Sequence, residues 1–169
     1  MTETLHDVRQ RATRIRVMIF DVDGVMTDGK LYLGGHGEEM KTMNIKDGLG
    51  LKRLQGAGIT PAVISGRPSA AIAARLHALG VEHLYLDSRD KQLDFEALLA
   101  ELELEPAQAA FMGDDLPDLP VMHQAGLALS VADAMPDVQA AAHWISQFSG
   151  GNGAVREACE LVIAAHSAH

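Results

Sequence analysis

The chain has 169 residues, of which 47% are hydrophobic and 22% are charged. This length allows one well-buried core and is short for two ordinary domains, and the composition excludes disordered, fibrous and membrane-spanning proteins. The formal net charge of -9 opposes binding to extended polyanions, so we expect no nucleic-acid partner. We therefore predict a single domain over residues 1–169.

The N-terminal segment and the cysteine content indicate the cellular compartment. No apolar run precedes Val17, because acidic Glu3 and Asp7 and several arginines occupy this segment, so we expect no signal peptide and no membrane partner. Cys159 is the single cysteine and cannot form an internal disulfide. Its helical surroundings favour a packed thiol in a reducing compartment, and we expect a cytoplasmic protein.

Short β-branched runs alternate with longer stretches of helical spacing from Arg16 onward. The expected strands are residues 16–20, 59–65, 82–86, 109–112, 127–131 and 143–145. The expected helices are residues 68–79, 90–104, 116–125, 135–142 and 153–166. Strands joined by helix-length crossovers predict an α/β fold with a parallel sheet that helices cover on both faces. Ligands of such folds bind at the carboxyl edge of the sheet.

Residues 29–43 interrupt the alternation of strands and helices. Two short strand-like runs flank the glycine-rich segment 34–37, a pattern that predicts a β-hairpin. Because two isolated strands are marginally stable without a partner, we interpret the hairpin as an interface or flap, with a simple surface excursion as the alternative.

Two acidic groups follow apolar strands. Asp21 and Asp23 end the first strand, and Asp114 and Asp115 follow the strand at 109–112. In a parallel sheet both groups reach the same edge, where crowded carboxylates repel one another unless a hard cation such as Mg²⁺ lies among them. Each group alone could also be a turn or a helix cap. A calcium loop counted from Asp21 fails, because Tyr32 stands where that loop requires Glu.

Two further strand ends offer groups that bind anions. Ser65 and Gly66 end a strand just before a helix, an arrangement that suits a phosphate oxygen. Lys91 opens the helix after the next strand, from which its ammonium can reach the same edge. Alone, Ser65 could be a strand end and Lys91 a solvated helix residue. Together with the acidic groups they indicate phosphoryl transfer.

These residues resemble the motifs of the haloacid dehalogenase superfamily, whose phosphatases use an aspartate nucleophile. The motifs match at residues 21–27, Ser65, Lys91 and residues 113–118, and the likeness spans residue 16 to about residue 130. Over nearly its whole length the chain is also similar to the short 3-deoxy-D-manno-octulosonate 8-phosphate (KDO 8-phosphate) phosphatases. The segments that carry this second likeness are residues 28–31, 44–48, 65–67, 113–122 and 150–157.

The resemblance implies a Rossmann-like (HAD-like) sheet and Mg²⁺ as the cofactor. Asp21 would attack phosphorus, and Asp23 would protonate the departing sugar oxygen and then activate water. Asp21, the Asp23 carbonyl and Asp114 would hold the metal ion, while Ser65 and Lys91 would stabilise the transferring group. The residues expected to support the metal ligands are Asp115 and Asp118.

The resemblance also implies how a small sugar phosphate is selected. Asp28 and Ser65 lie too close in the chain for an inserted cap domain, so neighbouring subunits of a homotetramer would complete each site. The expected substrate-binding residues are Thr27, Gly66, Arg67 and Arg75, with the arginines as candidates to clamp the sugar carboxylate. Residues 150–169 resemble a C-terminal tail that can reach an adjacent site, with helix punctuation as the alternative.

Three other functions remain open at this point. The first is hydrolysis of KDN 9-phosphate or another sugar phosphate on the same scaffold, although Arg67 favours the eight-carbon sugar. The second is a phospho-accepting receiver, whose phosphorylated Asp lies at a middle strand end that Ser65 occupies here. The third is an inactive oligomeric module. Lipopolysaccharide synthesis is the pathway that the family resemblance implies for the product.

Overall fold

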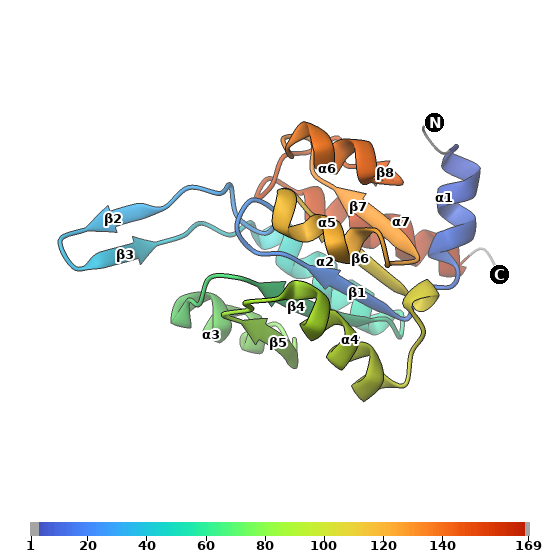
Figure 1. The fold of residues 1–169 in the computed structure, drawn as a ribbon, viewed down its shortest axis with the longest axis horizontal. Helices are drawn as coiled ribbons and strands as arrows, with labels where there is room; N and C mark the ends of the chain where they lie inside the picture. The colour runs from blue at the N-terminus through green and yellow to red at the C-terminus, as the bar shows by residue number, and fades with distance from the viewer. Residues whose placement is uncertain (1–3, 168–169) are drawn as a thin grey trace.

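Six parallel strands form the central sheet, in the order β5-β4-β1-β6-β7-β8 (Figure 1). The computed structural model describes residues 4–167, and at residues 38 and 39 the backbone alone. The strands are β1 (Val17–Phe20), β4 (Thr60–Ser65), β5 (His83–Leu86), β6 (Ala109–Gly113), β7 (Leu127–Ser130) and β8 (Trp144–Ile145). They confirm the predicted α/β fold, and each ends within a residue of its predicted position.

The register of the sheet positions the site. All residues of β1, β6 and β7 are buried, as expected for apolar strands covered on both faces. Phe20 at the end of β1 is paired with Val63 of β4 and Met112 of β6. The next residue, Asp21, donates its backbone N–H to the Met112 carbonyl at 3.0 Å. The first acidic residue is therefore fixed between the ends of β4 and β6.

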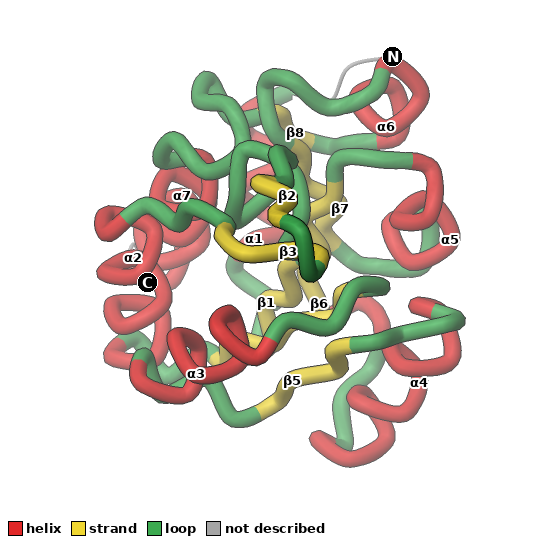
Figure 2. Tube along the Cα trace, turned by 90° about the vertical axis from the view of Figure 1, so that its left-hand side faces the viewer, coloured by secondary structure: helices red, strands yellow, loops and turns green. Residues whose placement is uncertain are grey.

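Helices cover both faces of the sheet: α2, α3 and α7 lie on one side, and α4, α5 and α6 on the other (Figure 2). Helix α1 packs against α7. The α-helices are α1 (Leu5–Ala12), α2 (Ile45–Gly56), α3 (Ala70–Ala78), α4 (Lys91–Leu102), α5 (Leu119–Met122), α6 (Pro136–Ala141) and α7 (Ala154–Ser167). Within the described residues, no helix has the length and apolarity that crossing a membrane requires.

The predicted hairpin is present and projects away from the body of the molecule (Figure 1). Its antiparallel strands are β2 (Tyr32–Gly34) and β3 (Gly37–Met40), which are shorter than the predicted arms, and their register shifts between Tyr32 and Leu33. The side chains of Tyr32, Leu33 and Met40 are exposed. Within the part of the chain that the structure describes, these three side chains are left uncovered.

Two helical segments differ from the predictions. Helix α1 was not predicted, although Thr4 and Asp7 form a capping box at its start. The helix predicted at residues 116–125 splits into a 3₁₀ turn, η2 (Leu116–Asp118), and the short α5, since prolines occupy the first turn of each.

The helix predicted at residues 153–166 is present as α7 (Ala154–Ser167), and it packs against the core of its own chain. Val155, Cys159 and Val162 of α7 are buried, and α7 packs closely against α2 of the same chain. The reach of this segment to an adjacent site stays a prediction, and its last two residues lie outside the described residues. Residues 150–153 form the turn that leads into α7.

Candidate active site

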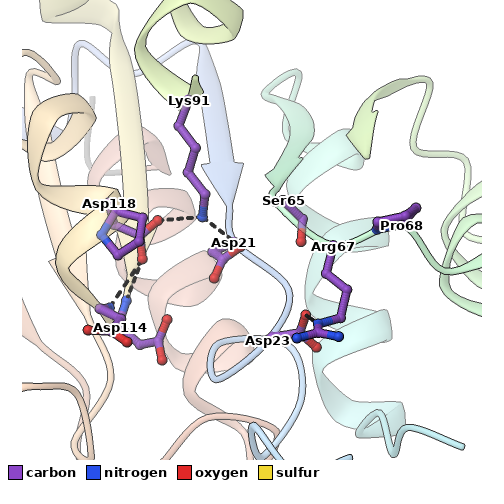
Figure 3. A pocket seen from close by; sticks show the side chains of 11 residues that line it. Asp21, Asp23, Ser65, Arg67, Pro68, Lys91, Asp114 and Asp118 are labelled. Carbon is purple, nitrogen blue, oxygen red and sulfur yellow. Dashed lines mark hydrogen bonds and ion pairs between the residues drawn. The ribbon is translucent and has the colours of Figure 1, made fainter. Parts of the chain in front are cut away.

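Asp21 is a buried carboxylate at the carboxyl end of β1. Lys91, the first residue of α4, extends its side chain toward it, with Nζ 2.9 Å from Asp21 Oδ1 and 2.7 Å from Asp118 Oδ1 (Figure 3). All three side chains are nearly buried. Burial alone would lower the pKa of Lys91, but the charges of Asp21 and Asp118 outweigh it and raise that pKa. The lysine is therefore a fixed cation beside Asp21.

Asp118 organises the second acidic loop. Its Oδ2 accepts hydrogen bonds from the backbone N–H groups of Asp114 at 2.9 Å and Asp115 at 3.3 Å. A side chain at Gly113 would overlap Asp118, so only glycine allows this close approach. Both Asp118 oxygens are engaged by the protein, whereas the Asp114 carboxylate faces the cavity (Figure 3).

Three carboxylates gather at the sheet edge: oxygens of Asp21, Asp114 and Asp118 all lie within 4.8 Å of one another. Burial and the charge of Asp118 raise the pKa of Asp21 to about 6, although Lys91 opposes this. Burial and the charges of Asp21 and Asp118 raise the pKa of Asp114 to about 8. Without a cation, burial and mutual repulsion favour the protonated forms of Asp21 and Asp114. The donor set therefore fits a divalent cation that prefers oxygen ligands.

The loop after Asp21 packs closely against the Asp114 side chain and against the backbone of Gly150. Gly24 has φ of 93°, and a Cβ there would overlap Asp114 Oδ2, while a Cβ at Gly150 would overlap the Gly24 carbonyl oxygen. Thr27 is buried, and its Oγ1 accepts hydrogen bonds from the N–H groups of Gly24 at 3.3 Å and Gly29 at 3.2 Å. Thr27 thus holds the loop from behind, which differs from the substrate contact that we predicted.

These groups surround an open cavity of about 530 Å³. Ser65 ends β4 and lies across the cavity from Asp114 and Asp118, and Asp21 lies between the two sides (Figure 3). The cavity therefore combines acidic groups on one wall with a hydroxyl and a glycine N–H on the other. Its lining residues are Asp21, Asp23, Ser65, Gly66, Arg67, Pro68, Lys91, Asp114, Asp115, Pro117 and Asp118.

Asp23 stands apart from the acidic cluster and contacts two cations. Lys41 Nζ lies 2.9 Å from its Oδ1, and Arg67 Nε lies 3.9 Å from its Oδ2 (Figure 3 shows the arginine). No sequence pattern marks Lys41 as a site residue. Its position immediately after a hairpin strand carries no local sign of a contact with a residue 18 positions earlier.

Arg75 does not line the cavity of its own chain. It is exposed on α3, and Gly48 of α2 lies beside it, since a Cβ at that glycine would be 3.1 Å from Arg75 Nη2. The structure thus brings together nine of the predicted site residues and leaves Thr27 and Arg75 outside the cavity. The nine are Asp21, Asp23, Ser65, Gly66, Arg67, Lys91, Asp114, Asp115 and Asp118.

The parallel sheet and the acidic edge define a haloacid dehalogenase-like hydrolase, and residues 44–126 match the model of that family. The KDO 8-phosphate phosphatase of Yersinia pestis is 47% identical over 94% of this chain and 85% of its own length. That of Escherichia coli strain K12 is 42% identical over the same shares.

Solved structures agree with the relatives. The phosphatase from Y. pestis superposes with a TM-score of 0.93 at 46% identity, covering 95% of this chain and 87% of that one. The enzyme from Moraxella catarrhalis, solved with magnesium, phosphate and KDO, has a TM-score of 0.94 at 37% identity and covers 97% and 94%. The chain belongs to the KDO 8-phosphate phosphatase family of the haloacid dehalogenase-like hydrolases.

Proposed function

We propose that this protein is a Mg²⁺-dependent phosphatase that hydrolyses KDO 8-phosphate to KDO and inorganic phosphate. The observation that carries the proposal is the buried Asp21 held 2.9 Å from Lys91 beside the Asp114 carboxylate, on the floor of an open cavity. Relatives of 42–47% identity bear the name of this activity, and the M. catarrhalis structure holds magnesium, phosphate and KDO.

In the first step, an oxygen of Asp21 forms a bond to phosphorus as the bond from phosphorus to the sugar oxygen breaks. Asp23 gives a proton to that departing oxygen, so the sugar leaves as an alcohol. In the second step, Asp23 takes a proton from a water molecule that attacks the phosphorus of the aspartyl phosphate, and Asp21 is released. Asp23 lines the same cavity as Asp21, as both steps require.

Residues that line the cavity can stabilise the negative charge on the phosphoryl group as it is transferred. The Lys91 ammonium and the Ser65 hydroxyl face the cavity, and the Gly66 N–H follows Ser65 at the strand end. Asp21, Asp114 and the Asp23 carbonyl would hold Mg²⁺, which supplies positive charge against the phosphate oxygens when bound. Asp118 supports this set by fixing Lys91 and the Asp114 backbone, and Asp115 caps the η2 turn.

The proposed assembly is a homotetramer whose neighbouring subunits complete each site. The cavity is open and the hairpin has exposed apolar side chains, among them Leu33 at 71% exposure. Arg67 lines its own cavity and suits a sugar carboxylate. Arg75 is exposed on α3, and in the proposed assembly it would enter the site of a neighbouring subunit. We further place the enzyme in the cytoplasm, with its product used in lipopolysaccharide synthesis.

A panel of phosphate esters tests the proposed substrate. Phosphate release with Mg²⁺ is measured for KDO 8-phosphate, KDN 9-phosphate and two ordinary hexose phosphates. We expect kcat/KM to be highest for KDO 8-phosphate, by at least tenfold over the nine-carbon ester. A higher value for KDN 9-phosphate would reassign the substrate. Uptake of one phosphate per chain without turnover would instead indicate a receiver, and no reaction an inactive module.

A further inference from the structure

Lys41 lies at the root of the hairpin and is buried, with only 2% of its side chain exposed. Lys30, on the opposite arm, is 73% exposed and lies 3.5 Å from Asp28. A lysine next to solvent ordinarily keeps its ammonium in water, and burying that charge is costly unless a counter-charge meets it. The burial of Lys41 therefore indicates a specific partner.

The partner is the carboxylate of Asp23. Lys41 Nζ donates a hydrogen bond to Oδ2 at 3.2 Å, and it lies 2.9 Å from Oδ1 in an ion pair that lacks hydrogen-bond alignment. Arg67 approaches the same carboxylate less closely, at 3.9 Å, and its side chain is 55% exposed. Lys41 is thus the fixed cation and Arg67 the movable one, since a half-exposed arginine can turn toward a substrate anion.

Two cations from outside the loop contact the Asp23 side chain. The backbone around Asp23 is held by Thr27 and Gly24, while its carboxylate contacts the side chains of Lys41 and Arg67. If Arg67 turns to the substrate, Lys41 is left to hold Asp23. A proton donor must lie within hydrogen-bond reach of the oxygen that it serves, so its placement matters to the reaction.

We infer that Lys41 is a positioning residue for Asp23, which holds that carboxyl group where it can serve the departing sugar oxygen. This inference rests on the proposed function. Because Lys41 is buried beneath Asp23 and does not line the cavity, it acts through Asp23 and not by touching substrate. It also makes the base of the hairpin part of the catalytic arrangement.

The test compares two leaving groups. A sugar alkoxide leaves slowly without a proton, whereas p-nitrophenolate leaves readily without one, so only the sugar ester depends on a well-placed acid. For Lys41→Met with Mg²⁺ bound, we expect kcat/KM to fall at least tenfold with KDO 8-phosphate and less than threefold with p-nitrophenyl phosphate. Lys41→Arg should recover part of the loss. In an Asp23→Asn background, Lys41→Met should cause no further loss.

The matched control is Lys30→Met, which removes an exposed lysine from the other hairpin arm and should leave both kcat/KM values unchanged. Equal losses with both esters after Lys41→Met would show a merely structural role and overturn the inference, as would no loss with either. If Lys41→Met fails to fold, Lys41→Gln gives the same comparison. Failure of the unmodified enzyme on KDO 8-phosphate alone contradicts the proposed substrate, and the comparison then uses whichever alkyl phosphate it hydrolyses.

Discussion

The two walls of the cavity are built differently. On the acidic wall, Lys91 Nζ lies 2.9 Å from Asp21 Oδ1 and 2.7 Å from Asp118 Oδ1. Asp21 directly follows β1, and Asp118 lies in the turn after β6. On the opposite wall, Arg67 is half exposed. The hairpin projects away from the body of the molecule (Figure 1). The groups that we propose for phosphoryl transfer thus all lie within one chain, whereas Arg67, which we propose to select the sugar, is half exposed. Rigid strand ends suit the chemistry, and movable groups suit recognition.

The largest expected effect comes from the acidic wall. Asp21→Asn removes the oxygen nucleophile while keeping the shape of the side chain, so phosphate release should fall by about four orders of magnitude or more. The fold should be retained, because burial already disfavours the charge at this position. Phosphate release and thermal unfolding are measured on the same sample. Full activity would refute the nucleophile assignment.

The opposite wall is tested through the hairpin. Leu33→Asp places a charge on the apolar hairpin surface and should convert the proposed tetramer to smaller species. We expect kcat/KM for the sugar phosphate to fall about tenfold to a hundredfold, roughly the range for losing a few kcal/mol of contacts. Light scattering gives the mass. Lys30→Met, on the same hairpin, is the control and should leave the mass unchanged. A monomeric wild type with full activity would contradict the shared site.

The close backbone contact between Gly150 and Gly24 is expected to have a smaller effect, which is on stability. Gly150→Ala would push a methyl group into the Gly24 carbonyl, so we expect a loss of about 1–3 kcal/mol in the free energy of unfolding. Gly35→Ala, at a hairpin position with open space around it, is the control. Urea unfolding measures both. Equal stabilities for the two variants would show that the turns can separate without cost.

The smallest expected effect is a pH dependence of stabilisation by Mg²⁺. In the metal-free protein the pKa values of Asp21 and Asp114 are raised to about 6 and about 8, so their protonated forms favour folding below pH 4. That contribution is lost as pH rises through the two raised values, because the ionised groups then repel. Mg²⁺ relieves the repulsion and binds the ionised forms.

The rise in Tm on adding Mg²⁺ should therefore be several degrees larger at pH 8.5 than at pH 5.5, which scanning calorimetry measures. Asp114→Asn removes one of the repelling charges and should reduce the difference. A rise of the same size at both pH values would contradict the account of the acidic wall.

Much of this contrast could be predicted from the sequence, because the acidic wall follows from local patterns. Buried parallel strands are continuous apolar runs, so the positions of Asp21, Ser65 and Asp114 at their ends can be inferred from the order of residues alone. The fold class and the gathering of these residues at one edge are confirmed. Their catalytic roles stay predictions.

What could not be predicted depends on tertiary contacts. The pairing of Lys41 with Asp23 arises only when the hairpin root returns to the first loop, and no spacing rule marks it. Thr27 has a hydroxyl that suits a substrate, but the loop turns it inward onto the backbone. The direction in which Arg75 faces depends on where α3 lies relative to α2. Helix α1 had a readable signal in its capping box, and that signal was overlooked.

The hairpin leaves and rejoins the body at nearly the same place: Gly29 lies against Gly24 as the chain departs, and Lys41 reaches Asp23 as it returns. An excursion with adjoining ends can be exchanged for a longer or shorter module while the strands below keep their spacing. This junction is accordingly a suitable insertion point for protein engineering. A cap from another protein could replace the hairpin there and change which phosphate esters the enzyme accepts.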